Sequence, residues 1–301
     1  MSDEAARRRH YGRFYGELDE AVDGRPVGVV AGNCQAESLR LALGDEVDLV
    51  RTPPVHELVA DDLPHLRRWL ARSGVLITQP IHDDYHGLPL GSRQLAAALG
   101  AGAAVCRIPV VRFAGLYPFH AIVRPPSDTS LVPPLVAYHD LRLLGRAAGL
   151  EVPATATPEA VRAVAAESLD QLRRREEAHA TVRIADLFER PTFDHMRTLN
   201  HPGNPVWVAL AGRVAQALGL ERIPPAPSRP LLTSVHAPRE AAVIETWGLP
   251  DEPTDHWVVD GVVIEGEAVR AEHLAWYGRH PEVVRAGLDR HAAVLELLGA
   301  R

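Results

Sequence analysis

Short apolar runs alternate with amphipathic segments through the first 113 residues, and this alternation restricts the fold more than any other feature of the chain. Strands are predicted at 27–31, 47–50, 75–78 and 105–113, and helices at 34–43, 63–72 and 92–99. Strands that alternate with helices favour a parallel sheet with helices on both faces. Ligands of such sheets bind beyond the carboxyl ends of the strands, so we expect the functional site there.

The chain changes in character after Pro126, where helical patterns dominate. The later predicted elements are helices at 134–149 and 158–179, a sharp loop at 200–205, a helix at 206–218, a linker at 224–230, a hairpin at 257–264 about Asp260-Gly261, and two closing helices. The domain organisation that we expect is a polar lead-in at 1–24, a main α/β domain at 25–225 that includes a helical segment at 127–198, and a small α+β extension at 226–301.

Composition excludes several kinds of chemistry. The 32 basic residues are all arginines, so the chain has no lysine for a Schiff base, a P-loop or a general base. With 39 acidic residues the net charge is -7, which disfavours nucleic acid as a partner. The chain has no apolar run of the ~20 residues that a membrane span needs, and its charged start lacks the apolar core of a secretory signal. We therefore expect a cytoplasmic protein with free thiols.

The turn Gly32-Asn33-Cys34-Gln35 carries the clearest chemical signal. Cys34 falls in the first turn of a predicted helix, directly after a strand, with Asn33 as the expected N-cap. Helix N–H groups and the helix dipole favour an anion there, and both effects lower a thiol pKa. The alternative is that Cys34 is a small apolar packing residue, as most free cysteines are. Cys106 lies inside an apolar run, and we expect it in the core.

A nucleophilic thiol needs a base and an oxyanion site. His201 is the candidate base because the surrounding loop constrains it just before a helix. No sequence spacing singles out the group that orients it; Asp83, Asp84 and Asp194 are candidates. His82 and His86 have the spacing of a metal pair, but the nearby prolines disfavour a helix there and a third ligand is missing, so we expect no metal site.

Two other kinds of site are excluded by motif. Gly28 and Gly32 flank the first strand instead of forming the Gly-x-Gly-x-x-Gly turn of a dinucleotide site. The Gly-x-Ser-x-Gly nucleophile elbow of α/β-hydrolases is also missing.

Four segments resemble, in order, the WcbI-type polysaccharide-biosynthesis acetyltransferase family. They are Val29–Ala36, Ile77–Ile81 with Tyr85, Arg112–Pro118, and Leu199–Asn204 with the helix that follows. The resemblance covers about residues 26–220, and its most specific part is the Gly-Asn-Cys-Gln turn. It implies an SGNH-hydrolase-like fold, a parallel sheet of the flavodoxin-like kind with helices on both faces, and binding of coenzyme A.

The resemblance also implies roles for individual residues. Cys34 occupies the position of the SGNH serine, and His201 that of the histidine. Gln79 and Gly115 lie where SGNH enzymes supply oxyanion donors. Further residues that we expect at the pocket are Asn33, Gln35 and Asn200, with Arg112 and Tyr117 toward the cofactor and Arg40 as another cation for its phosphates. One departure matters: Thr198 stands where the family places an aspartate, so either a Cys-His dyad or another acid such as Asp194 completes the site.

The leading functional hypothesis is acyl transfer from a pantetheine thioester, coenzyme A or a carrier protein, to a hydroxyl or amine acceptor in polysaccharide or natural-product biosynthesis. The thioester would be a co-substrate, with no tightly bound cofactor. The acceptor would be a small molecule or a glycan, and formation of an amide by a condensing enzyme is a variant. Two alternatives stay open: an ester or thioester hydrolase on the same scaffold, and a non-catalytic binding module with an inert Cys34.

Overall fold

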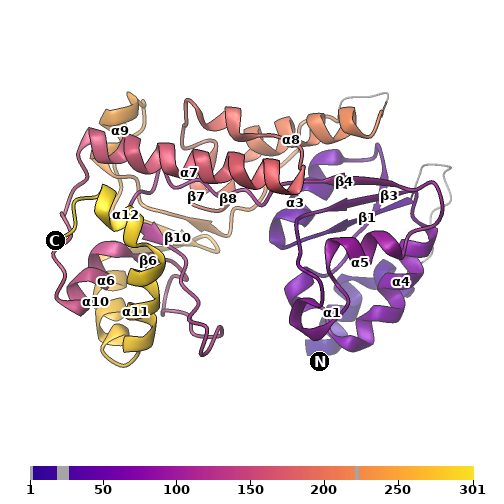
Figure 1. The fold of residues 1–301 in the computed structure, drawn as a ribbon, viewed down its shortest axis with the longest axis horizontal. Helices are drawn as coiled ribbons and strands as arrows, with labels where there is room; N and C mark the ends of the chain where they lie inside the picture. The colour runs from indigo at the N-terminus through magenta and orange to yellow at the C-terminus, as the bar shows by residue number, and fades with distance from the viewer. Residues whose placement is uncertain (1–2, 19–26, 221–223) are drawn as a thin grey trace. The chain divides into compact units, whose positions relative to one another are not determined.

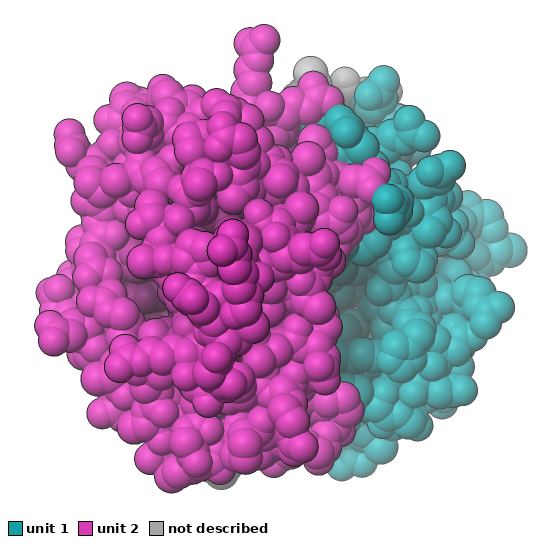
Figure 2. Space-filling model, turned by 60° about the vertical axis from the view of Figure 1, so that its left-hand side comes forward, with its two compact units in different colours: residues 1–111, 173–186, 204–232 teal, residues 112–172, 187–203, 233–301 magenta. Residues whose placement is uncertain are grey.

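The computed structural model describes residues 3–18, 27–220 and 224–301, and the chain divides into two compact units (Figures 1 and 2). The first unit comprises residues 1–111, 173–186 and 204–232, and the second comprises 112–172, 187–203 and 233–301. The predicted start of the main domain at residue 25 lies outside the described residues. The C-terminal segment 233–301 belongs to the same unit as residues 112–172.

A four-stranded sheet forms the centre of the first unit. Its strands are β1 (Val27–Ala31), β2 (Asp48–Val50), β3 (Val75–Thr78) and β4 (Ala104–Arg107). Their order is β2-β1-β3-β4, and each neighbouring pair is parallel, which confirms the predicted parallel sheet. Val29 is in register with Val50 and Leu76, so apolar side chains from three strands share one face. From β1 the chain continues to β2 on one side and then to β3 on the other side of β1. This reversal of strand order places a topological switch point between β1 and β3.

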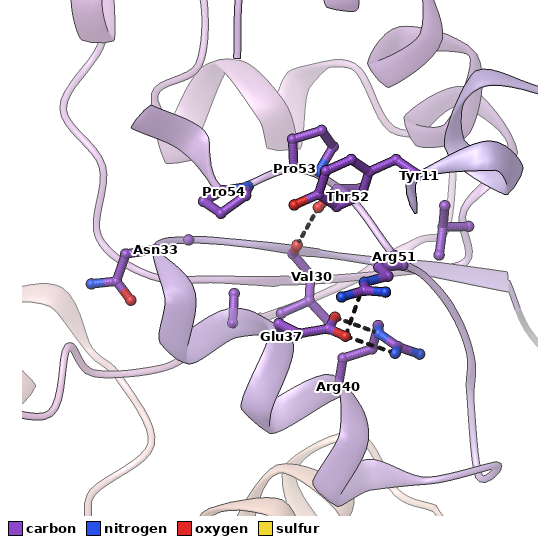
Figure 3. Close-up of a pocket in the computed structure, with 12 residues that line it drawn as sticks. Tyr11, Val30, Asn33, Glu37, Arg40, Arg51, Thr52, Pro53 and Pro54 are labelled. Atoms are coloured by element: carbon purple, nitrogen blue, oxygen red, sulfur yellow. Dashed lines mark hydrogen bonds and ion pairs between the residues drawn. The ribbon is translucent and has the colours of Figure 1, made fainter. Parts of the chain in front are cut away.

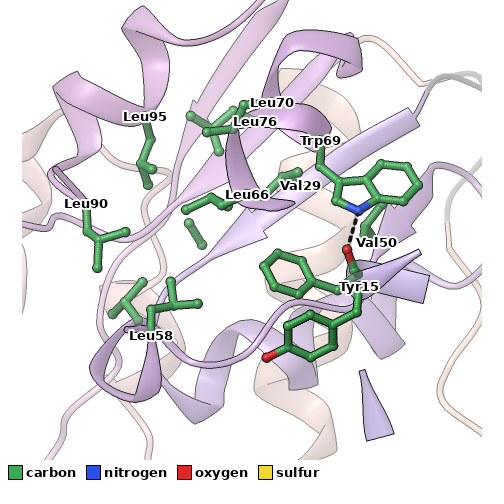
Figure 4. Packing of buried hydrophobic residues seen from close by; sticks show 13 residues of the cluster. Tyr15, Val29, Val50, Leu58, Leu66, Trp69, Leu70, Leu76, Leu90 and Leu95 are labelled. Carbon is green, nitrogen blue, oxygen red and sulfur yellow. Dashed lines mark hydrogen bonds between the residues drawn. The ribbon is translucent and has the colours of Figure 1, made fainter. Parts of the chain in front are cut away.

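Helices cover this sheet, and alternate residues of β1 face opposite sides. Val29 and Ala31 pack in a buried cluster with residues of α2 (Gly12–Tyr15), α4 (Leu63–Arg72) and α5 (Ser92–Ala97), shown in Figure 4. The Trp69 indole N–H donates to the Phe14 carbonyl at 3.0 Å, which joins α2 to α4. The opposite face is covered by α3 (Cys34–Leu43) and α8 (Asn204–Ala217), which pack on each other (Figure 1).

The second unit carries three small antiparallel sheets and most of the remaining helices. Its strands are β5 (His120–Ala121), β6 (His139–Asp140), β7 (Met196–Thr198), β8 (His201–Pro202), β9 (Val235–His236), β10 (His256–Val259) and β11 (Val262–Glu265). Its helices are α6 (Leu141–Ala148), α9 (Ala241–Trp247), α10 (Gly266–Tyr277), α11 (Pro281–Arg290) and α12 (Ala292–Leu297). The helices α10 and α11 both pack on α6, which ties the C-terminal segment to residues before it.

The other elements are α1 (Asp3–His10), α7 (Pro158–His179) and the short 3-10 helices η1 (Val55–Glu57), η2 (Ala60–Asp62), η3 (Tyr85–Gly87) and η4 (Ala185–Phe188). The predicted helix at 158–179 is confirmed as α7. None of the helices in the described ranges is both long and apolar enough to cross a bilayer.

Two elements test the later predictions in detail. The hairpin of β10 and β11 is confirmed, and Asp260 and Gly261 both have positive φ, as a two-residue hairpin turn requires. The helix predicted at 134–149 is shorter than expected and occupies only Leu141–Ala148. Leu135 follows two prolines and adopts a left-handed φ of 66°, and Asp140 then caps the helix through a hydrogen bond from the Arg142 N–H. The apolar residues of 134–140 therefore lie in irregular chain and β6, where Val136 and Tyr138 are buried and Leu135 is exposed.

Candidate functional site

The turn between β1 and α3 is built as the sequence predicts. The Asn33 side chain accepts a 2.9 Å hydrogen bond from the Gln35 N–H, so Asn33 is the N-cap and Cys34 is the first residue of α3. This places the thiol at the carboxyl end of β1, beside the switch point of the sheet. A nucleophile at this position is held by regular structure on both sides.

A network of hydrogen bonds from buried side-chain amides holds this turn in place. Gln79 accepts from the Asn33 N–H at 2.9 Å and donates its Nε2 to Oε1 of Gln35 at 3.2 Å. Gln35 exchanges two hydrogen bonds with the backbone of Val111, donating to the carbonyl at 2.8 Å and accepting from the N–H at 2.9 Å. A Cβ on Gly32 would lie 2.5 Å from Oε1 of Gln79, so a larger residue there would displace the Gln79 amide from this network. The network joins the carboxyl ends of β1 and β3 to the segment after β4.

This network gives Gln35 and Gln79 positioning roles. Both side chains are buried, at 1% and 2% exposure, and the amide of each is spent on its neighbours. The donors that face the Cys34 sulfur are instead the backbone N–H groups of Cys34 and Gln35. An oxyanion formed on a Cys34 adduct would meet these backbone donors first.

The electrostatics of Cys34 differ from the expectation of a lowered thiol pKa. The residue is exposed, yet the surrounding protein still desolvates its sulfur, and this raises the pKa of the thiol. The backbone N–H groups of Cys34 and Gln35 act in the predicted direction and lower the pKa, but desolvation outweighs them, and the Glu57 carboxylate adds to the increase. The resting form is therefore the thiol, which needs a base to become a nucleophile.

Cys106 behaves as predicted for a core residue. It is buried on β4, and burial raises its pKa to about 11.

A small hollow adjoins the turn (Figure 3). On its floor Glu37 accepts from Arg40 at 2.7 Å and pairs with Arg51 at 3.1 Å, while Arg51 lies over the ring of Tyr11. Arg40, considered for donor phosphates, is thus already engaged by a carboxylate one helical turn from Cys34.

His201 lies in the second unit and is the first residue of β8, directly after the tight connection from β7. The backbone N–H of His201 donates to Oγ1 of Thr198 at 3.2 Å, and the ring of Tyr138 meets the imidazole edge-on at 6.2 Å. The Tyr138 hydroxyl also donates to Oδ1 of Asn200 at 2.7 Å. A Cβ on Gly203 would lie 1.9 Å from the Asp194 carbonyl oxygen, so the chain can pass this close to Asp194 only with glycine at position 203. His201 is consequently held by Thr198 of the neighbouring strand and by the ring of Tyr138.

The His201 imidazole is neutral at physiological pH. Burial lowers its pKa to about 4; the Val235 carbonyl opposes this, while Arg197 and His236 lower it further. Nδ1 of His201 is buried and has no hydrogen-bond partner within the described ranges. No carboxylate is among the groups that perturb this ring, and Asp194 is exposed. Thr198 contacts the backbone of His201 through its hydroxyl.

The other predicted residues also fall in the second unit. Tyr117 is buried and donates its hydroxyl to the Met196 carbonyl at 2.9 Å, and burial raises its pKa. Gly115 is packed tightly enough that a Cβ would lie 2.4 Å from the Phe113 ring, and its carbonyl accepts from the Trp247 indole. Arg112 is half-buried and contributes to lowering the pKa of His291. The structure thus groups Asn33, Cys34, Gln35 and Gln79 in one unit, and Arg112, Gly115, Tyr117, Asn200 and His201 in the other.

The histidine pair considered for a metal is arranged differently. Nδ1 of His82 lies 2.8 Å from the Asp83 carbonyl, and the His86 ring stacks on Tyr85. Within the described ranges no three His, Cys, Asp or Glu side chains gather as metal ligands would.

Comparison with known proteins now identifies the family. The family model described as "Polysaccharide biosynthesis enzyme WcbI" matches residues 27–222. The chain belongs to the WcbI family. A solved structure of WcbI, described as a novel polysaccharide biosynthesis enzyme, matches with a TM-score of 0.75 at 18% identity, over 91% of this chain and 99% of that one. That structure is described as native protein without a disulfide bond between coenzyme A and one of its cysteines. No curated protein matches this chain.

Membership of the WcbI family confirms the resemblance, and the structural match confirms the α/β fold with its parallel sheet. The match to WcbI extends over 91% of the chain, whereas the family model ends at residue 222. Two supporting groups could not be predicted from the sequence: the backbone of Val111, which anchors Gln35, and Tyr138, which holds the His201 loop. Neither residue carries a motif, and both lie at least 60 positions from their partners.

Proposed function

We propose that this protein transfers an acyl group from a pantetheine thioester, carried by coenzyme A or a carrier protein, to a hydroxyl or amine acceptor in polysaccharide or natural-product biosynthesis. Cys34 is the nucleophile and His201 is the general base and acid. The observation that carries the proposal is the placement of Cys34: an exposed thiol at the first position of α3, on a turn fixed by buried amides, with backbone N–H groups directed at its sulfur. The relative whose description names coenzyme A and a cysteine supports the same donor.

The first half-reaction follows from the two protonation states. The imidazole of His201 takes the Cys34 proton as sulfur attacks the thioester carbon, because at neutral pH the thiol is protonated and the imidazole is free. The new Sγ–C bond forms, the donor C–S bond breaks, and the imidazolium returns the proton to the departing thiolate. The backbone N–H groups of Cys34 and Gln35 stabilise the oxyanion of the intermediate.

The second half-reaction releases the acyl group. The acceptor O–H or N–H loses its proton to His201 as it attacks the acyl carbon, the Sγ–C bond breaks, and the proton passes to Sγ. The sum converts the thioester and the acceptor into an acylated acceptor and a free thiol. With no carboxylate facing the His201 ring within the described ranges, the pair acts as a dyad, and the Thr198 hydroxyl holds the backbone of the histidine loop.

Intact-mass spectrometry tests this proposal directly. Incubation with acetyl-coenzyme A, or with an acetyl-loaded carrier protein, should add one acetyl group to the protein. Cys34→Ala should retain donor binding and never acquire the adduct, whereas Cys106→Ala should acquire it normally because Cys106 is a buried packing residue. Full turnover by Cys34→Ala would overturn the covalent mechanism. His201→Gln should slow acylation by a factor of about 10² to 10⁴, as loss of a general base does.

A further inference from the structure

A cavity of about 980 Å³ opens in the second unit, apart from every residue assigned above except Tyr138. Its walls come from the α6 region, the start of α9, the segment before β10, and the first turns of α10. This volume is typical of a site for a small organic ligand. The lining combines apolar side chains with charged and polar groups beside one aromatic wall, a mixture that suits a hydroxylated ring.

The aromatic side chains of the cavity wall connect the cavity to His201 through ring contacts. Trp257 lines the cavity and stacks on Tyr138 at 5.6 Å between ring centroids. Tyr138 also lines the cavity, and its ring meets the His201 imidazole edge-on. A ligand in this cavity therefore lies one side chain away from the proposed base.

The charges of the lining do not balance at its inner wall. Arg142 serves two carboxylates: it pairs with Asp140 at 2.6 Å and with Glu240 at 2.8 Å. Its remaining donor, Nη1, is spent on the Ala154 carbonyl. Elsewhere in the cavity Asp255 is matched by Arg270, and Arg239 pairs with Asp251, which lies outside the lining. With Arg146 and Glu151 the lining carries four arginines and four carboxylates, so the excess of negative charge is local: Asp140 and Glu240 share the single Arg142.

One oxygen of the Glu240 carboxylate remains available for a hydrogen bond to a ligand. Both oxygens of Asp140 are bonded to Arg142, whereas Glu240 contributes only Oε1 to that arginine. The Glu240 side chain is 22% exposed, and burial raises its pKa, as expected of a carboxylate short of positive partners. A cationic donor from a ligand would supply the missing partner.

His273 gives an independent sign of a ligand. It lines the cavity at 1% exposure, and its Nε2–H donates to the Pro134 carbonyl at 3.0 Å. That bond leaves Nδ1 as an acceptor, and Nδ1 has no hydrogen-bond partner within the described ranges. A buried acceptor without a partner costs about 1–3 kcal/mol, which a ligand hydroxyl would recover.

We propose that this cavity is the acceptor site and that it takes an amino sugar, with the ligand ammonium on Glu240, a hydroxyl on Nδ1 of His273 and the sugar ring against Trp257. The inference rests on the proposed acyl transfer for the meaning of "acceptor", but binding of the sugar does not depend on Cys34. Of the acceptors that acyl transfer admits, the negative inner wall selects those that carry a positive charge and disfavours phosphorylated ones.

Isothermal titration with four sugars tests the proposal on the full chain. Glucosamine should bind at least tenfold more tightly than glucose or N-acetylglucosamine, since these lack the ammonium, and glucose 6-phosphate should bind no better than glucose. Glu240→Gln should reduce glucosamine binding to the level of glucose. The matched control is Glu245→Gln, an exposed carboxylate on the same helix α9, which should leave all four affinities unchanged.

Two further variants keep the outcome decisive. Ala241→Trp, at an exposed position on the cavity wall, should block all sugar binding without disturbing the core. Cys34→Ala should bind glucosamine as the wild type does, so failure of the acyl-enzyme mechanism leaves this result intact. Equal binding of glucosamine and glucose, tighter binding of glucose 6-phosphate, no binding of any sugar, or an unchanged preference in Glu240→Gln would each overturn the proposal.

Discussion

Nε2 of Gln79 donates a hydrogen bond to Oε1 of Gln35, 44 residues earlier in the chain, and this bond joins the end of β3 to the helix that begins at Cys34. Gln79→Leu should lower the free energy of unfolding by about 1–3 kcal/mol, because the Asn33 N–H loses its acceptor and Oε1 of Gln35 loses one of its donors, keeping the Val111 N–H. Urea unfolding measures this loss. Gln171→Leu removes an exposed amide and should change the same quantity by less than about 0.5 kcal/mol. A Gln79 variant as stable as wild type would contradict a positioning role.

The raised pKa of Cys34 predicts how the free protein reacts with alkylating agents. At pH 7 the thiolate fraction should be below the roughly 3% of an ordinary thiol with a pKa of about 8.5. The rate of iodoacetamide modification should therefore rise steadily with pH and reach no plateau below pH 9. Peptide mapping should find the label on Cys34 and not on buried Cys106. A plateau below pH 8 would show a preformed thiolate and remove the need for a base.

Acid should destabilise the second unit. Burial lowers the pKa of His120, His201 and His291 to about 4 and that of His139 to about 3. Since an unfolded histidine titrates near 6.5, the unfolded state binds more protons between pH 6.5 and 4, and stability present above pH 6.5 is lost as the pH falls through that window. Each histidine contributes about 1.4 kcal/mol per pH unit within its window. Hydrogen exchange at pH 7 and pH 5 should show the loss of protection within residues 112–172, 187–203 and 233–301.

A single variant isolates this effect. The His120 ring stacks between Trp257 and Tyr117 and has no partner for its Nδ1 within the described residues. His120→Phe should keep the stack and remove one titrating group, so the fall in unfolding free energy between pH 7 and pH 5 should be smaller than in the wild type. An unchanged pH dependence would show that His120 is not buried in its neutral form.

Two glycines form a matched pair for stability. Gly203→Ala should destabilise the protein by more than 2 kcal/mol, roughly, because its Cβ would overlap the Asp194 carbonyl oxygen that closes the His201 loop. Gly212→Ala lies on α8 with open space around the new Cβ and should stabilise by about 0.5–1 kcal/mol through helix propensity. Thermal unfolding of both variants is the measurement. Similar melting temperatures would mean that the loop relaxes around the alanine.

The sequence predicts those parts of the fold that local patterns determine. Apolar runs bounded by turns locate β1 and β3, and Asn33 ahead of an amphipathic segment locates the start of α3. The predicted helix at 134–149 is too long, since the apolar residues before Leu141 belong to irregular chain and a short strand. Periodicity cannot separate these two cases when prolines and a left-handed residue such as Leu135 interrupt the chain.

The site is predictable only where one short segment carries it. Cys34 stands out because its turn and its helix are contiguous in sequence. The roles of Gln35 and Gln79 depend on partners 44 and 76 residues distant, which no local spacing reveals. The direction of the thiol pKa was also predicted wrongly, because helix N–H groups are visible in a sequence whereas the protein mass that desolvates the sulfur is not.

The hydrogen bonds that fix the Cys34 turn run through Asn33, Gln35 and Gln79, and none of them uses the sulfur. The stability of the turn therefore does not depend on the sulfur. Cys34→Ser should keep the same hydrogen bonds and leave the free energy of unfolding almost unchanged. The side chain at position 34 can therefore be changed in design or in evolution without rebuilding the turn that presents it.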